Sequence, residues 1–398
     1  MKFSKRVSGL RPSPVFELLK KSKQMKAEGK DIISLSVGEL DKGTYEPIKA
    51  AGKKAIDENY TKYTGSAGRE SFREQIANQF SSIYNWDIKM SNVAISAGCK
   101  YALFVIFQTL CNPDDEVVFQ APYWMSYPDI IGLSGARSVI VPTDEKTHFK
   151  ITASQLEKAI TPKTKIFLLN SPNNPTSSIH TEEELKELGE VLKKHPQVLI
   201  VTDDIYDQIV FSGDRAPHFY SVCPDLKDRV IAVNGASKNY LMTGWRLGWV
   251  FGPADFIKIV SSFQSQSISC VNSIAQKAAE DSLHLCQKDL KNMVSELKEL
   301  RDFFSQGLQK IPLLKVHPSK GAFYLWVGVQ GLVGKKYKDF KIQSSKDVMN
   351  LLLEEKYLVC LPGEEFGTPG YLRFTYGLKK EILKKAISRL SEFVSDLT

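Results

Sequence analysis

The 398-residue sequence lacks the features that mark several classes of protein. It has no apolar run of the ~18–20 residues that a membrane-spanning helix needs, so we expect no membrane partner. The six histidines lie far apart, without His-Glu-x-x-His or paired ligand spacing, which argues against a catalytic metal. No strand-like run leads into Gly-x-Gly-x-x-Gly, which disfavours a nicotinamide-dependent dehydrogenase.

The charge pattern and the cysteines further limit the classes of protein to which this chain could belong. The formal net charge of +8 is modest, and there is no Lys/Arg block with interleaved aromatic residues, so we expect no nucleic-acid partner. The six cysteines show no Cys-x-x-Cys spacing, which is typical of reduced thiols in a cytoplasmic protein. The composition, with 42% hydrophobic and 25% charged residues, is that of a globular protein. The length predicts two domains.

From about residue 46, strand and helix patterns alternate without a long linker. Two of the predicted helices begin at capping boxes, Thr152/Gln155 and Thr181/Glu184. Short strands rich in Val and Ile that alternate with helices predict βαβ units around a mostly parallel sheet. The predicted strands are 93–96, 116–119, 138–141, 165–169, 198–202 and 230–233.

The pattern changes near residue 279. Apolar residues at three- and four-residue spacings over 290–308 predict one long amphipathic helix. After it we expect a strand at 321–327, a helix from Ser345, short strands near Leu358 and Tyr371, and a final helix. A helix at 15–29 and a strand at 31–38 come before the alternating region. The sequence thus predicts an α/β chain with a large domain (47–290) and a smaller α/β domain formed by both chain ends (1–46 and 291–398).

The most distinctive stretch contains Lys238 and Arg246. It reads Ser-Lys-Asn-Tyr-Leu-Met-Thr-Gly-Trp-Arg-Leu-Gly and follows the apolar run 230–233. A lysine just past a buried strand can be desolvated, and its amine can then form an imine with a carbonyl. An arginine eight residues further on can hold a phosphate. Pyridoxal phosphate (PLP) is the cofactor that carries both groups.

Three other predicted strands end in polar residues, where ligands of open α/β sheets collect. Gly98 leads into a helix whose free N-terminal amides can bind an anion. Asn174 and Tyr206 could hydrogen-bond the phenolate oxygen of the cofactor ring from opposite sides. A carboxylate of the Asp203–Asp204 pair could keep the ring nitrogen protonated. Successive strand residues point to opposite faces, so only one of the two acids can meet the ring.

A further arginine lies in the apolar run Gly-Tyr-Leu-Arg-Phe-Thr-Tyr at 370–376. A guanidinium is costly to bury unless it is paired. The α-carboxylate of an amino-acid substrate needs a partner with two parallel donors, and Arg373 is a candidate for that partner.

These stretches together resemble class I, fold-type I PLP aminotransferases, and most closely the bacterial aspartate aminotransferase branch. The likeness runs from Ser8 to the final helix and includes the string Asn-x-Pro-Asn-Asn-Pro-Thr before residue 177. It implies a large domain with a mostly parallel sheet and PLP-dependent transamination. Aspartate is the expected amino donor and 2-oxoglutarate the expected acceptor. Lys238 would hold the cofactor and move the substrate α-proton, and Asp203 would meet the ring nitrogen.

The resemblance also assigns the other site residues. Tyr63 would reach the phosphate of the neighbouring subunit, which requires a homodimer with shared active sites. Lys100 occupies the position of a receptor for a distal carboxylate, although a solvated lysine in a first helical turn is the other interpretation. The cofactor residues implied are Tyr63, Gly98, Cys99, Lys100, Trp124, Asn174, Asp203, Tyr206, Lys238 and Arg246, and the substrate residues are Gly38, Lys100, Trp124, Asn174 and Arg373.

The chain departs from the family pattern at two places and leaves other functions open. The family's Gly-Glu-Pro-Asp has leucine at position 40, and its Pro-Thr-Gly ends in Ser177. Transamination of prephenate, aromatic amino acids or alanine remains an alternative. A PLP-dependent β-lyase or an aminocyclopropane-forming enzyme would keep the same cofactor residues. A PLP-binding transcription regulator would need a helix-turn-helix, for which the stretch before Val15 leaves no room.

The N-terminus carries one more expectation. The first sixteen residues are basic and lack acids, as in transit peptides. However, residues 8–13 resemble the start of mature family enzymes, so we expect no targeting segment.

Overall fold

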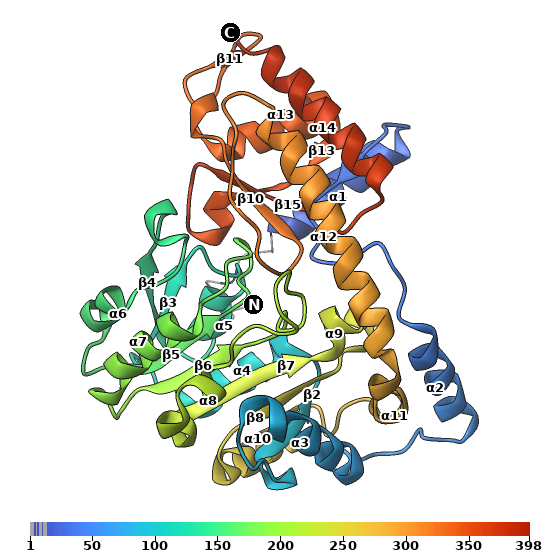
Figure 1. Cartoon of the computed structure of the whole chain (residues 1–398), viewed down its shortest axis with the longest axis vertical. Coiled ribbons are helices and arrows are strands. Elements are labelled where there is room, and N and C mark those ends of the chain that lie inside the picture. The colour runs from blue at the N-terminus through green and yellow to red at the C-terminus, as the bar shows by residue number, and fades with distance from the viewer. Residues whose placement is uncertain (1–3, 5, 8–9, 11–13) are drawn as a thin grey trace.

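The computed structural model describes residues 4, 6–7, 10 and 14–398. Residues 8–13, on which the expectation of no targeting segment depends, lie outside the described residues except for Leu10. Figure 1 shows a large unit built around one sheet, with a smaller unit above it to which both chain ends contribute. Within the described part of the chain, none of the helices has the length and apolar character needed to cross a bilayer.

The large unit is built on a sheet of seven strands among the described residues, in the order β2-β8-β7-β6-β5-β3-β4. All six predicted strands are present in it. The missed strand is β8, which runs antiparallel between β2 and β7, while the other pairs are parallel. The bounds are β2 (Val93–Ser96), β3 (Glu116–Ala121), β4 (Arg137–Pro142), β5 (Thr164–Asn170), β6 (Leu199–Asp203), β7 (Val230–Gly235) and β8 (Gly248–Phe251).

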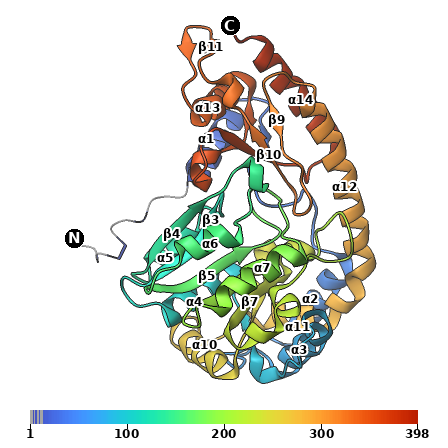
Figure 2. The ribbon, with the colours of Figure 1, turned by 60° about the vertical axis from the view of Figure 1, so that its left-hand side comes forward.

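Helices cover both faces of this sheet (Figure 2). Alternate residues of a strand enter different cores, because their side chains point to opposite faces. In β5, Ile166 packs in the core with α4 and α10, and Phe167 packs in the core with α3 and α7. Both predicted capping boxes are formed, at the starts of α6 and α7. The helices are α2 (Glu46–Asp57), α3 (Glu70–Tyr84), α4 (Cys99–Leu110), α5 (Tyr127–Gly132), α6 (Ala153–Ala159), α7 (Glu182–Lys193), α8 (Phe219–Val222), α9 (Ala236–Asn239), α10 (Ala254–Ser267) and α11 (Ser273–Ser282).

The smaller unit joins the two ends of the chain. Strand β1 (Ile33–Ser34) pairs with β13 (Leu358–Val359), and a separate sheet has the order β14-β15-β10-β9. Strand β1 is shorter than the predicted strand 31–38, because the residues after Ser34 turn into the cavity described below. The other elements are α1 (Pro14–Ala27), β9 (Lys315–Val316), β10 (Tyr324–Gly328), β11 (Lys336–Tyr337), β12 (Phe340–Lys341), α13 (Ser345–Lys356), β14 (Leu361–Pro362), β15 (Tyr371–Thr375) and α14 (Lys380–Ser395).

The predicted long helix is α12 (Gln287–Gln309), which connects the two units along one side of the molecule (Figure 2). Its buried residues include Leu290, Met293, Leu297, Phe304 and Leu308, at the predicted helical spacing. These side chains pack in one core with the sheet of the smaller unit. We propose the domain division 1–46 with 291–398, and 47–290, with α12 crossing between the domains.

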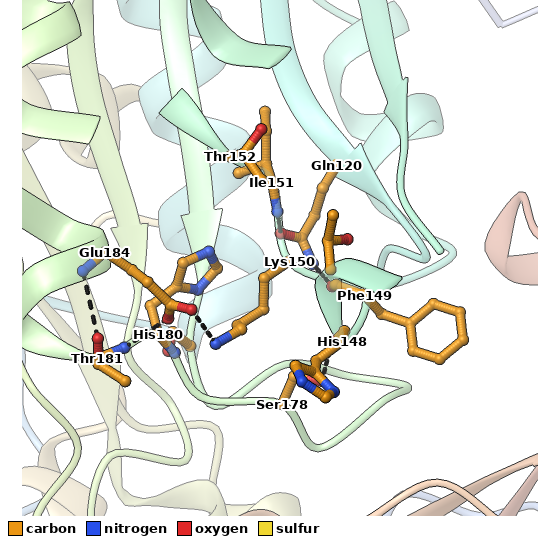
Figure 3. Close-up of polar contacts among 12 residues, drawn as sticks. Gln120, His148, Phe149, Lys150, Ile151, Thr152, Ser178, His180, Thr181 and Glu184 are labelled. Atoms are coloured by element: carbon orange, nitrogen blue, oxygen red, sulfur yellow. Dashed lines mark hydrogen bonds and ion pairs between the residues drawn. The ribbon is translucent and has the colours of Figure 1, made fainter. Parts of the chain in front are cut away.

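A second connection is the segment 144–150, which we call the strap. Figure 3 shows how the large domain holds it. The side chain of Gln120 donates to the carbonyl oxygen of Phe149 at 2.7 Å and accepts from the amide of Ile151 at 3.0 Å. The buried Lys150 forms an ion pair with Glu184 on α7. The strap is therefore fixed to the large domain by both polar and charged contacts.

The other side of the strap contacts the small domain. The ring of Phe149 lies edge-on to His317, with ring centroids 4.8 Å apart, and to Tyr371, at 5.4 Å. The carboxylate of Glu145 pairs with Lys315 and accepts a hydrogen bond from the Tyr371 hydroxyl at 3.2 Å. Tyr371 lies on β15, two residues before Arg373. The strap thus joins the large domain to the strand that carries Arg373.

Candidate active site

A cavity of about 500 Å³ lies where the strand ends of the large sheet meet the small domain. It opens at the carboxyl ends of β6 and β7 and is bounded on the other side by residues of β10, β14 and β15. This is the edge at which ligands of open α/β sheets bind. The predicted residues that line it are Gly38, Cys99, Lys100, Trp124, Asn174, Asp203, Tyr206, Lys238, Arg246 and Arg373.

Lys238 lies on α9, directly after the end of β7. Its amine donates a hydrogen bond to the carbonyl oxygen of Gly38 at 2.7 Å. Burial lowers the pKa of Lys238 to about 8, and the positive charges of Arg373 and Arg246 act in the same direction. A substantial fraction of this amine is therefore neutral near pH 8, which is the form that acts as a nucleophile or base.

Asp203 is the last residue of β6, and its two carboxylate oxygens have different surroundings. The hydroxyl of Tyr127 donates to Oδ2 at 2.7 Å, whereas buried Oδ1 has no hydrogen-bond partner among the described residues. Burial raises the pKa of Asp203 to about 6, and the Tyr127 hydrogen bond opposes that rise. At neutral pH this carboxylate is mostly charged, with one oxygen left for a donor in the cavity.

The neighbouring acid has a different role. Asp204 accepts from the hydroxyl of Thr202 at 2.9 Å and lies 3.4 Å from Nδ1 of His218. It is not among the residues that line the cavity, so within this acidic pair only Asp203 does, in the described structure. This placement agrees with the expectation from strand alternation.

The first turn of α4 and Arg246 form one end of the cavity. Gly98 precedes the helix with a φ of +83°, and no side chain among the described residues caps the helix. A Cβ at Gly98 would lie 2.6 Å from Nη2 of Arg246, so only glycine lets the guanidinium approach this closely. A helix N-terminus beside a guanidinium suits an anion such as phosphate. Burial raises the pKa of the adjacent Cys99, which keeps it a neutral thiol.

Arg373 lies on β15 at the opposite end and is 4% exposed. It donates to Oδ1 of Asn174 at 3.0 Å and to the carbonyl oxygen of Ser36, while its Nε has no partner among the described residues. Its guanidinium lies 4.5 Å from the ring centroid of Tyr324. Within the described part of the chain, no carboxylate forms an ion pair with it. A buried cation without an acidic partner favours an anionic ligand.

Lys100 and Trp124 lie together in the cavity wall. The ammonium of Lys100 is 4.8 Å from the ring centroid of Trp124. Burial lowers the pKa of Lys100, and the charge of Arg246 adds to the effect. Lys100 as a whole residue is exposed, but its side chain is among those that line the cavity. Its role as a receptor for a distal carboxylate stays a prediction.

Two predicted residues do not line the cavity. Gly98 lies behind Arg246, as described above. Tyr63 is 87% exposed and is not among the residues that line the cavity of its own chain. Its contact with the phosphate in a neighbouring subunit stays a prediction.

Several lining or supporting residues were not predicted. Ser237 directly precedes Lys238 and could have been found from that position alone. The others have no local signal, because their contacts join distant parts of the chain. They are Ser36, Tyr127, Tyr324 and Leu361. Asn170 also lines the cavity and does have a local signal, because it begins the string Asn-x-Pro-Asn-Asn-Pro-Thr.

Residues 30–390 match the family described as aminotransferase class I and II, and the chain belongs to this family of enzymes. Enzymes of class I depend on PLP. The predicted family and fold class are thus confirmed.

All six cysteines lie in the described part of the chain, and none of them forms a disulfide bond.

The chain is 39% identical to the aspartate/prephenate aminotransferase of Nitrosomonas europaea, with 99% of this chain and 100% of that protein covered. It is 38% identical to the aspartate aminotransferase of Geobacillus stearothermophilus, with 99% of each covered. Among solved structures, the aspartate aminotransferase of Rhizobium meliloti superposes with a TM-score of 0.97 at 34% identity over 100% of both chains. The Thermus thermophilus aspartate aminotransferase with maleate gives 0.91 at 30% identity, covering 99% of this chain and 100% of that one.

Proposed function

We propose that this chain transfers the amino group of aspartate to 2-oxoglutarate with PLP bound in the cavity. The observation that carries the proposal is the grouping of three unusual side chains in that cavity. Lys238 has an amine with a lowered pKa. Among the described residues, one carboxylate oxygen of Asp203 has no hydrogen-bond partner and the buried charge of Arg373 has no acidic partner. All three side chains line the cavity. The names of the relatives in Nitrosomonas and Geobacillus support aspartate as the donor.

The residues present fit PLP. Oδ1 of Asp203, which has no partner in the described part of the chain, would accept a hydrogen bond from the ring nitrogen. The amides at the start of α4, with Arg246, would hold the phosphate. Asn174 and Tyr206 would flank the phenolate oxygen, and Trp124 would stack on the ring. When bound, PLP stabilises negative charge that develops at the substrate α-carbon.

The chain's own residues would then do three things. Arg373 binds and orients the substrate α-carboxylate through the guanidinium N–H groups that its hydrogen bonds to Asn174 and Ser36 leave free. The Lys238 amine, held by the Gly38 carbonyl, removes the α-proton as a general base, for which a pKa of about 8 is suitable. Lys100 attracts the distal carboxylate of aspartate.

We also propose a homodimer with shared active sites. Tyr63 is a large aromatic residue that is 87% exposed in the single chain. Its predicted role is to donate to the phosphate in the neighbouring subunit. Contact with a second copy of the chain would bury this ring and complete the anion end of the cavity.

The test of this proposal is a panel of amino donors with 2-oxoglutarate, measured as glutamate formed by the PLP-loaded protein. We expect aspartate to give the highest kcat/KM. Equal rates with alanine or aromatic amino acids would overturn the aspartate assignment. Release of pyruvate and ammonia from cystathionine without glutamate formation would indicate a β-lyase. Prephenate is included as a second acceptor because the Nitrosomonas relative carries that name.

Lys100→Ala should lower kcat/KM for aspartate by about 10–100-fold, because a hydrogen bond to a charged group contributes about 1.5–3 kcal/mol. Alanine, which has no distal carboxylate, should react within about threefold of its original rate. Steady-state kinetics with both donors measures the difference. Lys89→Ala, at a surface lysine paired with Asp87, is the control. Unchanged aspartate turnover in Lys100→Ala would contradict the assigned role.

Gly98→Ala should weaken PLP binding by about tenfold or more, because the added Cβ must displace Arg246 and adopt a left-handed backbone. A fluorescence titration of the cofactor-free protein with PLP measures the affinity. The matched control is Gly132→Ala, where an added Cβ meets no atom of the described chain within 4 Å and φ is not positive. Equal affinities for the two variants would show that the Gly98–Arg246 contact does not form the phosphate site.

A further inference from the structure

Tyr324 lines the cavity, although neither its strand nor its neighbours predicted a role for it. It lies on β10 of the small domain, and its hydroxyl is 2.8 Å from the hydroxyl of Tyr206 in the large domain. The two residues are 1% and 4% exposed. Within the described part of the chain, each hydroxyl is the other's one hydrogen-bond partner. The pair is thus a buried contact between the two domains at the cavity wall.

A buried pair of hydroxyls has two protons and only one shared hydrogen bond. Burial raises the pKa of both Tyr206 and Tyr324, so both keep their protons at neutral pH. If Tyr206 donated to Tyr324, the Tyr206 proton would lie in the hydrogen bond between the two hydroxyls and could not be donated to a ligand. If Tyr324 donates to Tyr206, the Tyr206 proton is free to point toward a ligand in the cavity. The direction of this one hydrogen bond therefore decides whether Tyr206 can donate to a bound group.

The surroundings favour Tyr324 as the donor. The guanidinium of Arg373 lies 4.5 Å from the centroid of its ring, and a cation over the ring withdraws electron density from the hydroxyl. A Cβ added at Gly38 would lie 2.9 Å from the Tyr324 hydroxyl oxygen, so the backbone of that loop closes in on the same group. Tyr324 has little room to turn its proton elsewhere.

The backbone of Tyr324 is also fixed from the large domain. The hydroxyl of Ser177 donates to the Tyr324 carbonyl oxygen at 3.0 Å, and the Tyr324 amide donates back to that hydroxyl at 3.3 Å. Ser177 has a φ of +59°, a backbone conformation that favours glycine. It is the residue that replaces the glycine of the family pattern, and its side chain supplies both contacts.

We propose that Tyr324 is a positioning residue that donates its proton to the Tyr206 hydroxyl and so directs the Tyr206 proton into the cavity. The proposal rests on the proposed function, in which the Tyr206 hydroxyl donates a hydrogen bond to the phenolate oxygen of PLP. Ser177 holds the backbone of Tyr324, and Arg373 strengthens it as a donor. The arrangement makes a substrate-binding arginine and a cofactor-binding tyrosine depend on one small-domain side chain.

The test is Tyr324→Phe, which keeps the ring over Arg373 and removes only the hydroxyl. The readout is the midpoint pH of the visible-absorbance change of the bound cofactor. A hydrogen bond donated to the phenolate oxygen stabilises its charged form, so weakening that bond should raise the midpoint, by about 0.5–1 pH unit. Tyr206→Phe should raise it further. The double variant should match Tyr206→Phe, because Tyr324 acts through Tyr206.

Tyr376→Phe is the matched control. Its hydroxyl is also buried in the small domain, where it lies 3.0 Å from the Ser319 hydroxyl and donates to the Ala322 carbonyl at 3.1 Å. We expect the midpoint pH of the cofactor absorbance change to be the same in Tyr376→Phe as in the unmutated protein.

A second readout for Tyr324→Phe is the PLP affinity of the cofactor-free protein, which should fall about threefold to tenfold. The KM for aspartate should stay within about twofold of its original value.

The outcomes separate the two proposals. An unchanged midpoint in Tyr324→Phe together with a raised one in Tyr206→Phe would overturn the role of Tyr324 and leave the proposed function standing. Additive shifts in the double variant would also overturn it, because they would show that Tyr324 acts independently of Tyr206. If the unmutated chain gave no cofactor absorbance, the proposed function itself would fail.

Discussion

Replacing Lys238 by alanine should lower the rate of transamination by at least about 10⁴-fold, since the variant loses its nucleophile and its general base together. No other lysine of the described chain has its amine at the Gly38 carbonyl, where the 2.7 Å hydrogen bond holds it. Glutamate formation from aspartate and 2-oxoglutarate measures the loss. Borohydride treatment of the loaded protein should attach the cofactor to the peptide containing Lys238 and leave the variant unlabelled.

Two further variants and a pH series make this expectation specific. Lys238→Arg keeps a positive charge but not the nucleophilic amine, so it should be equally inactive. Added methylamine should restore part of the activity to Lys238→Ala and none to Lys238→Arg, in which the side chain fills the space. Because burial lowers the pKa of Lys238 to about 8, its reaction with a carbonyl reagent should increase as the pH rises through that value. Turnover retained by Lys238→Ala would contradict the assignment.

Arg373→Ala should lower kcat/KM for aspartate by about 10³-fold, mainly through KM, because the substrate carboxylate loses a bidentate partner in a buried setting. Arg373→Lys should recover only part of this loss, since an ammonium cannot present two parallel donors. Calorimetric titration with an unreactive dicarboxylate should show the same order of affinities.

The stability of the Arg373 variants is the internal control. Arg373→Ala breaks the hydrogen bonds to Asn174 and Ser36, but it also removes a buried cation that has no acidic partner among the described residues. Because these two effects oppose each other, the melting temperature should not fall by more than about 5 °C. Arg389→Ala, at a small-domain arginine paired with Asp31, should leave kcat/KM unchanged. Substrate affinity retained in Arg373→Ala would place the carboxylate elsewhere in the cavity.

The sequence was sufficient for most of the fold because the signals are local. Runs of Val and Ile predicted the strands β2 to β7, and helical spacing predicted α12. Strand β8 was missed because Gly248–Phe251 is only four residues long and directly follows the Arg246 motif. Its pairing with β2 joins residues about 150 positions apart, and no local pattern reports such a contact.

The part of the site that lies at strand ends was also predictable from the sequence. Asp203 ends a strand, and Asn174 and Lys238 follow strands, and the carboxyl ends of these strands share one edge of a sheet. Their positions in the chain therefore predicted that they lie close together. Tyr127 and Tyr324 bind residues that are 76 and 118 positions away, Asp203 and Tyr206 respectively. Their hydroxyls gain a function only through tertiary contacts, which periodicity and spacing do not encode.

The strap has a consequence for the energetics of ligand capture. Phe149 and Glu145 hold Tyr371, and Tyr371 shares β15 with Arg373. The strap thus fixes the strand, and the hydrogen bonds to Asn174 and Ser36 fix the guanidinium itself before any ligand arrives. The conformational entropy that an incoming carboxylate would otherwise have to remove from a mobile arginine has therefore already been lost during folding. Affinity for the carboxylate is in this sense built partly by residues that never touch it.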